Sequence, residues 1–194
     1  MAGRFEALPG GGAAVALDEV EISILRSLAV QLMELIGPGD EPVEGEDPLA
    51  ALFAEGPSEP PSDPALKRLF PDAYGDEDEE LRAAAADFRR YTENDLRARK
   101  RQDALAVIRS LDGLASDDEG GAVLKLTPDE SRSWLGALND LRLTIGTRLE
   151  VTDEDESGEL YRLPDADPRK PMVMAYLWLG ALQESLVETL MSGA

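Results

Sequence analysis

The chain has 194 residues, with 40 Asp and Glu against 19 Lys and Arg, which gives a formal net charge of -21. A negative field of this size repels nucleic acids and anionic membranes, so any nucleic-acid site needs a local basic exception. The chain contains no Cys and no His, which excludes disulfides, thiol redox sensing, Cys nucleophiles, Ser-His-Asp triads and nearly all zinc sites. We therefore expect a protein that is not an enzyme and that has no cofactor or metal site.

Size and hydrophobic content predict one domain over residues 1–194 with one core, since 43% of the residues are hydrophobic. No apolar signal region follows Met1, so we expect the protein to stay in the cytoplasm. Residues 172–182 carry no charge, but this run is far shorter than the roughly 20 residues that span a bilayer. The patterns below predict a mainly α-helical, single-domain bundle around a buried C-terminal helix, with a small N-terminal β-hairpin.

The N-terminal segment predicts two strands followed by a helix. Residues 4–8 and 13–17 are short apolar runs, and the Pro-Gly-Gly-Gly sequence between them suits the turn of a β-hairpin. Residues 122–126 are a candidate third strand. Asp18 and Glu21 form a capping box for a helix that ends at Gly37.

Residues 40–64 are rich in Pro, Gly, Asp and Glu, and we expect them to form a flexible acidic arm within the domain. The apolar island of the arm is at residues 49–53, where Asp47 as cap and Pro48 predict one or two helical turns. Another short helix is expected over residues 65–70, before Pro71.

A long helix is expected from about residue 76 to about residue 111. The consecutive acids at residues 76–80 suit the positive end of the helix dipole, and their spacing is not that of an organised metal site. The helix contains a basic patch, which consists of Arg97, Arg99, Lys100 and Arg101. The patch is either a surface for nucleic acid or another anion, or a solvated face compensated by Glu93–Arg97 and Asp95–Arg99 pairs. We favour the compensated face.

Thr127, Pro128 and Glu130 predict the start of a further helix, which extends to Leu149 with an apolar stripe. A polar cluster is set into this helix and consists of Asn139, Asp140, Arg142 and Arg148. The cluster is either a buried network that fixes the helix register or a pocket that binds a partner or ligand. Because Arg142 lies between apolar residues, we expect it to pair with an acid near Asp140 or with Glu184.

Residues 153–164 begin like a calcium-binding loop, but the twelfth position, which should be a bidentate Glu, is Pro164. An acidic surface loop is therefore favoured. The C-terminal helix follows over residues 172–191. We expect no face of its charge-free first half to meet water, and we expect this half to be central in the fold.

The segment Trp134–Leu149, with residues 17–28 and the Tyr176–Gly180 motif, resembles the AosR-like family of actinobacterial regulators. The resemblance covers most of the chain outside the arm. It implies a cytoplasmic regulator from an uncharacterised family that is encoded beside the ClpS protease adaptor. The family takes its name from a redox-sensing transcription regulator that acts with an alternative sigma factor in the stress response. Thiol sensing needs a cysteine pair, so that mechanism cannot apply to this chain.

The favoured function is a non-enzymatic regulatory protein that associates with a sigma factor or a proteolysis adaptor. The alternative is a regulator that binds DNA directly through Arg97–Arg101, and the weaker alternative is an accessory factor of ClpS-linked proteolysis. A carboxylate enzyme would need two acids that converge in a pocket, which spacing alone does not reveal. We expect direct binding to nucleic acid to be weak, and we expect no membrane contact.

Overall fold

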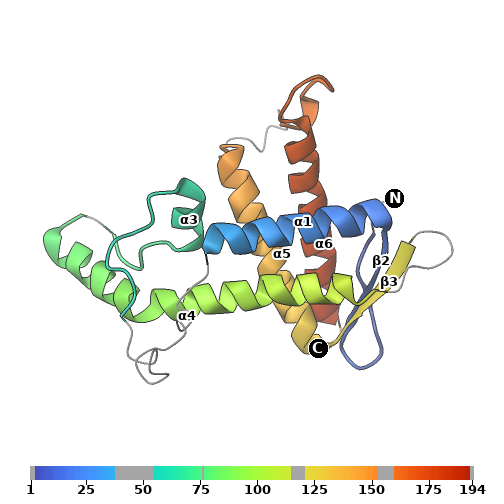
Figure 1. The fold of residues 1–194 in the computed structure, drawn as a ribbon, viewed down its shortest axis with the longest axis horizontal. Helices are drawn as coiled ribbons and strands as arrows, with labels where there is room; N and C mark the ends of the chain where they lie inside the picture. Colours follow the sequence, from blue (N-terminus) through green and yellow to red (C-terminus); the bar gives the residue numbers. More distant parts are fainter. Residues whose placement is uncertain (1–2, 38–54, 76, 115–120, 153–159, 193–194) are drawn as a thin grey trace, which may run out of the picture.

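A computed structural model describes residues 3–37, 55–75, 77–114, 121–152 and 160–192 (Figure 1). The elements, in chain order, are β1 (Glu6–Ala7), β2 (Ala13–Asp18), α1 (Glu19–Ile36), α3 (Pro64–Leu69), α4 (Glu79–Asp112), β3 (Gly121–Leu126), α5 (Pro128–Arg148), the 3-10 helix η2 (Leu160–Arg162) and α6 (Lys170–Ser192). The predicted mainly α-helical class and the N-terminal hairpin are confirmed.

The three strands form one antiparallel sheet in the order β1-β2-β3, so the predicted third strand is confirmed. β2 and β3 pair from Ala13 opposite Leu126 to Asp18 opposite Gly121. Alternate residues of both strands are buried, as expected when one face of a sheet covers a core. The turn between β1 and β2 places Gly10 and Gly11 at φ 102° and 89°, which side chains with a Cβ rarely adopt.

The helix starts lie where the capping signals predict them. Asp18 accepts a hydrogen bond from the backbone of Glu21, whose carboxylate accepts one from the backbone N–H of Asp18, completing the capping box of α1. Thr127 and Glu130 form the same box at the start of α5. Capping depends on neighbouring residues only, and for this reason it can be predicted without knowledge of the tertiary fold.

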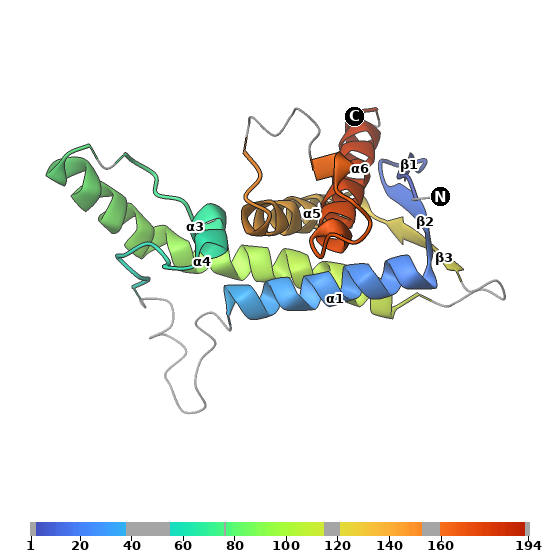
Figure 2. The ribbon, with the colours of Figure 1, turned by 90° about the horizontal axis from the view of Figure 1, so that it is seen from above.

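The helix at the centre of the packing is α5, which contacts α1, α3, α4, α6 and β3 (Figure 2). Trp134, the largest fully buried side chain, lies on α5 and contacts Phe5 edge to face at a centroid distance of 6.1 Å. α6 contributes Leu179, Leu182 and Leu186 to the core and packs on α5, β1 and β2.

The expectation that the first half of the C-terminal helix has no face for water is wrong. Met172 and Met174 are 44% and 54% exposed, and Ala181 is also exposed. A charge-free sequence shows that a helix can be buried on all sides, but α6 packs on α5, β1 and β2 and leaves these residues uncovered. The buried stripe is therefore narrower than the uncharged run.

The chain segments near both ends contact each other. The backbone N–H of Phe5 donates to Ser185 Oγ at 3.2 Å, and Thr189 Oγ1 donates to the Phe5 carbonyl oxygen at 3.2 Å. Arg4 also pairs with Glu188. α6 thus packs against the edge of the sheet that β1 forms.

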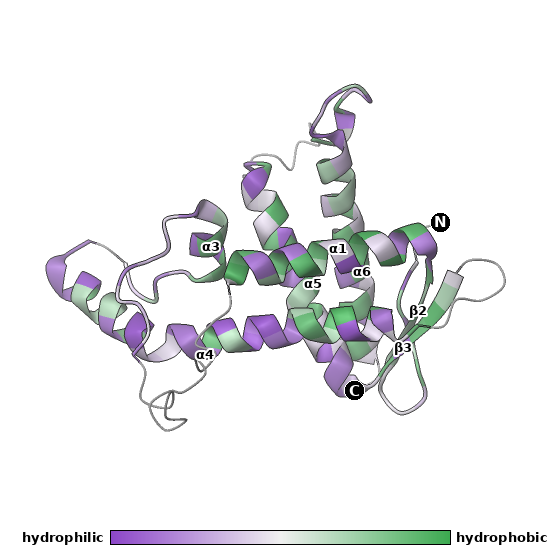
Figure 3. Ribbon diagram, viewed as in Figure 1, coloured by the Kyte–Doolittle hydropathy of each residue, from purple (hydrophilic) through white to green (hydrophobic). Residues whose placement is uncertain are grey.

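α4 has 34 residues, which corresponds to a helix about 50 Å long. Its C-terminal half packs on α1 and α5, whereas its N-terminal half extends beyond both helices and is accompanied by residues 55–75 (Figures 1 and 2). Strongly hydrophilic residues lie along the middle of α4, where the basic patch is found (Figure 3). The long helix is confirmed, but it begins at Glu79, three residues after the predicted start, with Asp78 as its cap and Glu79 and Glu80 as the acids of its first turn.

Some predictions fall outside the described residues. These are the helical turns at residues 49–53, most of the acidic arm, and residues 153–159 of the calcium-like loop. The described end of the arm region contacts the helices, because the Gly56 N–H donates to the Arg90 carbonyl at 2.8 Å and Asp63 caps α3. The single-domain organisation and the boundaries of the arm stay predictions.

Candidate functional site

Two members of the basic patch bind the C-terminal end of α1. Arg97 Nη1 donates to the Ile36 carbonyl oxygen at 2.7 Å, and Arg101 donates to the carbonyls of Gly37 and, at 3.4 Å, Met33. The last turn of α1 contains no basic residue of its own. Cations near the last carbonyls of a helix satisfy these acceptors and offset the negative end of its dipole. These arginines therefore cap α1 from another helix.

Lys100 joins the basic patch to the polar cluster. Its Nζ atom is 2.6 Å from Asp140 Oδ1, across the interface between α4 and α5. The lysine side chain is 15% exposed and the aspartate side chain 3% exposed. The two sets of residues that the sequence presented as separate features thus meet in one buried ion pair.

Asp103 lies near this pair, and burial raises the pKa of its carboxyl group, against the lowering effects of Ser133, Arg99 and Lys100. Burial also raises the pKa of Asp140; Lys100 opposes this shift, and the nearby charge of Asp103 adds to it. Gly136 lets α5 approach closely here, since a Cβ at this position would lie 2.6 Å from Asp103 Oδ2. The α4–α5 interface therefore holds two carboxyl groups whose pKa values are raised by burial.

A buried ion network on α4 was missed by the sequence analysis. Glu93 pairs with Arg89 on one side and with Arg97, at 2.7 Å, on the other. Arg89 also donates to Asp72 and to the Phe70 carbonyl oxygen, both at 2.9 Å. The spacing of four residues from Glu93 to Arg97 predicted one pair of this network on a solvated face, and the same spacing from Arg89 to Glu93 was the available signal for the rest.

The basic patch is therefore engaged within the fold. The predicted Glu93–Arg97 pair is confirmed, although Glu93 is buried and not at the surface. The described residues show no ion pair between Asp95 and Arg99. Of the four basic residues only Arg99 is exposed; Arg97, Lys100 and Arg101 are half-buried.

The members of the polar cluster contact different neighbours of α5. Arg148 pairs with Asp63, the N-cap of α3, at 2.7 Å, while Asp140 faces α4. On the side of α6, Asn139 Oδ1 lies 3.5 Å from Gln183 Nε2. The cluster does not converge on one pocket, so its members fasten α5 to three neighbouring helices.

The expected ion pair of Arg142 is wrong. Its Nη1 donates to the neutral amide oxygen of Gln183 at 2.7 Å, and its guanidinium lies over the Tyr176 ring at 5.4 Å from the centroid. No ion pair links Arg142 with Glu184 or Asp140 among the described residues. Arg142 is half-buried and lines a groove, so its guanidinium can reach solvent without a carboxylate partner.

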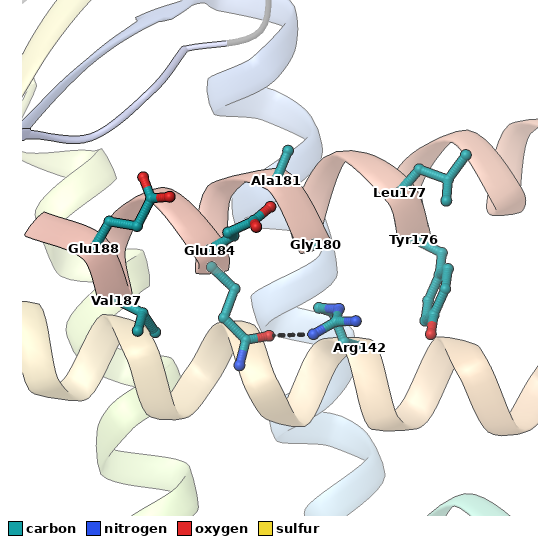
Figure 4. A pocket seen from close by; sticks show the side chains of 9 residues that line it. Arg142, Tyr176, Leu177, Gly180, Ala181, Glu184, Val187 and Glu188 are labelled. Atoms are coloured by element: carbon teal, nitrogen blue, oxygen red, sulfur yellow. Dashed lines mark hydrogen bonds between the residues drawn. The ribbon is translucent and has the colours of Figure 1, made fainter. Parts of the chain in front are cut away.

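This groove lies between α5 and α6, has a volume of about 640 Å³ and is lined by Arg142, Tyr176, Leu177, Gly180, Ala181, Gln183, Glu184, Val187 and Glu188. Tyr176 and Val187 point from α6 toward α5, whereas Glu184 and Glu188 point away from α5 (Figure 4). Gln183 reaches α5 through its hydrogen bond with Arg142. A Cβ added at Gly146 would lie 3.2 Å from the Tyr176 ring, and one at Gly180 would lie 3.5 Å from Arg142 Nε. Each helix therefore places a glycine under a large side chain of the other.

The described residues form no group of acids that could hold a metal ion. Asp103 and Asp140 are two neighbouring carboxyl groups with raised pKa values, the kind of pair that general acid catalysis uses. However, neither residue lines the α5–α6 groove, and Asp140 is only 2% exposed. This pair is suited to linking helices and is poorly placed to meet a substrate.

Comparison with known proteins identifies relatives of the whole chain. Residues 2–190 match the model of a family described as a domain of unknown function, DUF2017. The chain belongs to the DUF2017 family. The oxidative stress regulators AosR of Mycobacterium tuberculosis H37Rv and of Mycobacterium bovis are each 30% identical to this DUF2017 chain. Each alignment covers 97% of this chain and 86% of the relative, which confirms the AosR-like resemblance.

No solved structure matches this DUF2017 protein. Among its described helices, none combines the length and the apolar character that crossing a membrane requires.

Proposed function

We propose that this chain is a regulatory protein of the oxidative-stress response and that it acts by binding a protein of the transcription machinery, an alternative sigma factor. The mycobacterial relatives named as oxidative stress regulators support the regulatory role. The sigma factor comes from the resemblance described above. The proposed protein is cytoplasmic and non-enzymatic, and it uses no thiol switch because the chain has no cysteine.

The observation that most supports protein association is the internal use of the basic patch. Arg97 and Arg101 hold carbonyl groups of α1, and Lys100 is paired with buried Asp140. A protein that binds duplex DNA neutralises several phosphates with accessible Lys and Arg. The patch leaves Arg99 for this purpose on a chain of net charge -21. Direct promoter reading through Arg97–Arg101 is therefore disfavoured.

The α5–α6 groove suits a protein partner better than DNA. Leu177, Ala181 and Val187 give it apolar surface, and Arg142 and Tyr176 are residue types that are enriched at protein interfaces. Glu184 and Glu188 stand on its α6 side and repel phosphate. An apolar side chain of a bound protein segment fits this combination of surfaces.

The test is a set of titrations at near-physiological salt. The purified chain is titrated with each alternative sigma factor of its host, with ClpS and with a promoter duplex. We expect binding to a sigma factor, and we expect no duplex binding with a Kd below the micromolar range. Near-physiological salt is used because low salt exaggerates non-specific attraction to DNA.

Two exposed positions provide a matched pair of variants. Ala181→Arg places a bulky cation in the groove and should weaken sigma-factor binding at least tenfold, whereas Ser23→Arg on α1 should leave it unchanged. Sub-micromolar duplex binding that Arg99→Glu abolishes would establish the DNA-binding alternative instead. Binding to ClpS without binding to any sigma factor would favour the role in proteolysis.

A further inference from the structure

Exposed aromatic side chains gather on the N-terminal half of α4 and on the segment that precedes this helix. Tyr74, Phe88 and Tyr91 are 48%, 49% and 68% exposed, and Leu96 is 37% exposed. The rings of Tyr74 and Phe88 meet edge to face with their centroids 6.3 Å apart. Phe88 and Tyr91 are three residues apart and therefore neighbours on the helix surface. We call Tyr74, Phe88, Tyr91 and Leu96 the aromatic patch. A contiguous exposed apolar group of this kind marks an interaction site more often than single exposed residues do.

A small hollow adjoins the aromatic patch. It has a volume of about 50 Å³ and is lined by Phe70, Pro71, Ala73, Ala85, Phe88, Arg89, Thr92, Glu93 and Leu96. Arg89 fixes its walls, because it bonds to the Phe70 carbonyl, to Asp72 and to Glu93. The hollow can receive the end of one apolar side chain. Because the walls are held before binding, little ordering is needed when a ligand docks.

The surroundings of the aromatic patch are acidic. Residues 72–96 contain nine Asp and Glu but three Arg. Asp87 and Asp95, four residues before and after Tyr91, are exposed on the same helix face. Of the three arginines, Arg89 is buried, and Arg90 lies within 3.8 Å of carboxylates of Asp87 and Glu55. The surface thus combines aromatic anchors with a negative rim.

We propose that the aromatic patch is a docking surface for a basic amphipathic segment of a protein partner. An apolar side chain of the segment enters the hollow, and its Lys or Arg side chains face Asp87 and Asp95 or lie on the Tyr91 ring. This inference rests on the proposed function, since it describes the chemistry of the protein that the regulator binds. It concerns a different face of the molecule from the α5–α6 groove.

The charge of the patch argues against two other occupants. A second copy of the chain would bring two acidic rims together in a symmetric dimer, which like charges oppose. Residues 40–54 of the same chain carry five acids and no base, so they lack the required charge as well. A basic partner segment satisfies both the aromatic and the acidic parts of the surface.

The test uses the full chain and a fluorescently labelled 18-residue peptide with Leu on one helical face and Lys and Arg on the other. Anisotropy at near-physiological salt measures its affinity. Tyr91→Ser and Phe88→Ser should each weaken binding several-fold and together at least tenfold, because truncated aromatic anchors carry much of an interface's affinity. Val20→Ser on α1, which removes a side chain 65% exposed, should change the affinity less than twofold. Asp87→Lys with Asp95→Lys should also weaken binding, and a peptide with Glu in place of Lys and Arg should not bind.

Equal peptide affinity for the parent and the double aromatic variant would overturn the proposal, since the overall charge would then be the cause of binding. Failure of the peptide to bind the full chain would overturn it too. Parent dimers in sedimentation that the aromatic variants abolish would assign the patch to a second copy instead. If a sigma factor binds the double aromatic variant as it binds the parent, this inference fails while the proposed function stands. If the peptide binds with the expected dependence on the aromatic residues but no sigma factor does, the surface stands and the proposed partner falls.

Discussion

Replacing Lys100 by Met leaves Asp140 without its cation, and the cost of this change should depend on pH. In the native chain burial raises the pKa of Asp140 even with Lys100 2.6 Å away. A carboxyl group whose pKa is raised by folding stabilises the fold below its unfolded pKa, and this contribution is lost as the pH rises through the folded pKa. Removal of the lysine raises the pKa further, so the loss at neutral pH becomes larger.

This charge penalty has an upper limit, because the stranded Asp140 can take up a proton instead of staying charged. An unfolded Asp has a pKa of about 3.9, and each pH unit above it costs about 1.4 kcal/mol for the group to hold its proton. The stranded carboxylate of Lys100→Met can therefore cost no more than about 4 kcal/mol at pH 7 and about 1.5 kcal/mol at pH 5. Breaking a buried ion pair costs about 3 to 5 kcal/mol, which is close to the limit at pH 7. A cost of 3 kcal/mol would lower Tm by about 6 to 12 °C in a chain of this size.

Urea unfolding followed by far-UV circular dichroism at both pH values measures this effect. Lys100→Met should lose about 3 kcal/mol at pH 7 and about half of that or less at pH 5. The double variant with Asp140→Asn should recover about 2 kcal/mol at pH 7, because no charge remains buried. Arg99→Met, one residue away and exposed, is the control and should stay within about 0.5 kcal/mol of the parent. An equal loss at both pH values, or a double variant no more stable than Lys100→Met, would show that lost packing and not stranded charge is the cause.

Three further predictions follow from the contacts of single side chains. Arg97→Ala should destabilise the chain by about 2 kcal/mol, because it removes a charged donor from Ile36 and a partner from Glu93. Hydrogen exchange should show faster opening of the last turn of α1. Unchanged exchange there would refute the capping role. Arg142→Met should alter stability by less than about 1 kcal/mol in urea unfolding. The variant loses a hydrogen bond to a neutral amide, but it also removes a buried Nε donor that has no partner among the described residues. A loss above about 3 kcal/mol would point to an ion pair instead. Hydrogen peroxide should oxidise the exposed Met172, Met174 and Met191 before the half-buried Met33, with little loss of helical signal, which mass spectrometry and circular dichroism can follow. A dithiothreitol-reversible switch in the isolated chain would contradict the absence of thiols.

The helices and strands could be predicted because their signals are local. Asp18 with Glu21, and Thr127 with Glu130, mark helix starts through contacts three residues long. The pairing of charges could not be predicted in the same way. Arg97 and Lys100 find their partners Ile36 and Asp140 at separations of 61 and 40 residues, which depend on how α4 crosses α1 and α5.

Sequence spacing did offer a correct partner for Arg97, but it gave no sign that Glu93 is buried. Glu93 can be buried because Arg89 and Arg97, each one turn away along α4, together satisfy its carboxylate. The groove was missed for a related reason. Gly146 and Gly180 allow α5 and α6 to approach closely, yet in the sequence they are isolated glycines within helices. The absence of charge in residues 172–182 also indicated more burial than packing on one side provides.

The contact between Phe5 and α6 has a consequence for synthesis on the ribosome. Phe5 is synthesised before α6, yet its backbone N–H donates to Ser185 and its carbonyl oxygen accepts from Thr189, at separations of 180 and 184 residues. Until α6 has left the exit tunnel, Phe5 and the neighbouring strand lack these partners. The core around Phe5 and Trp134 then lacks the side chains of α6. Closure of this part of the core therefore waits for the synthesis of α6, and until then the N-terminal segment exposes apolar surface that a chaperone can bind.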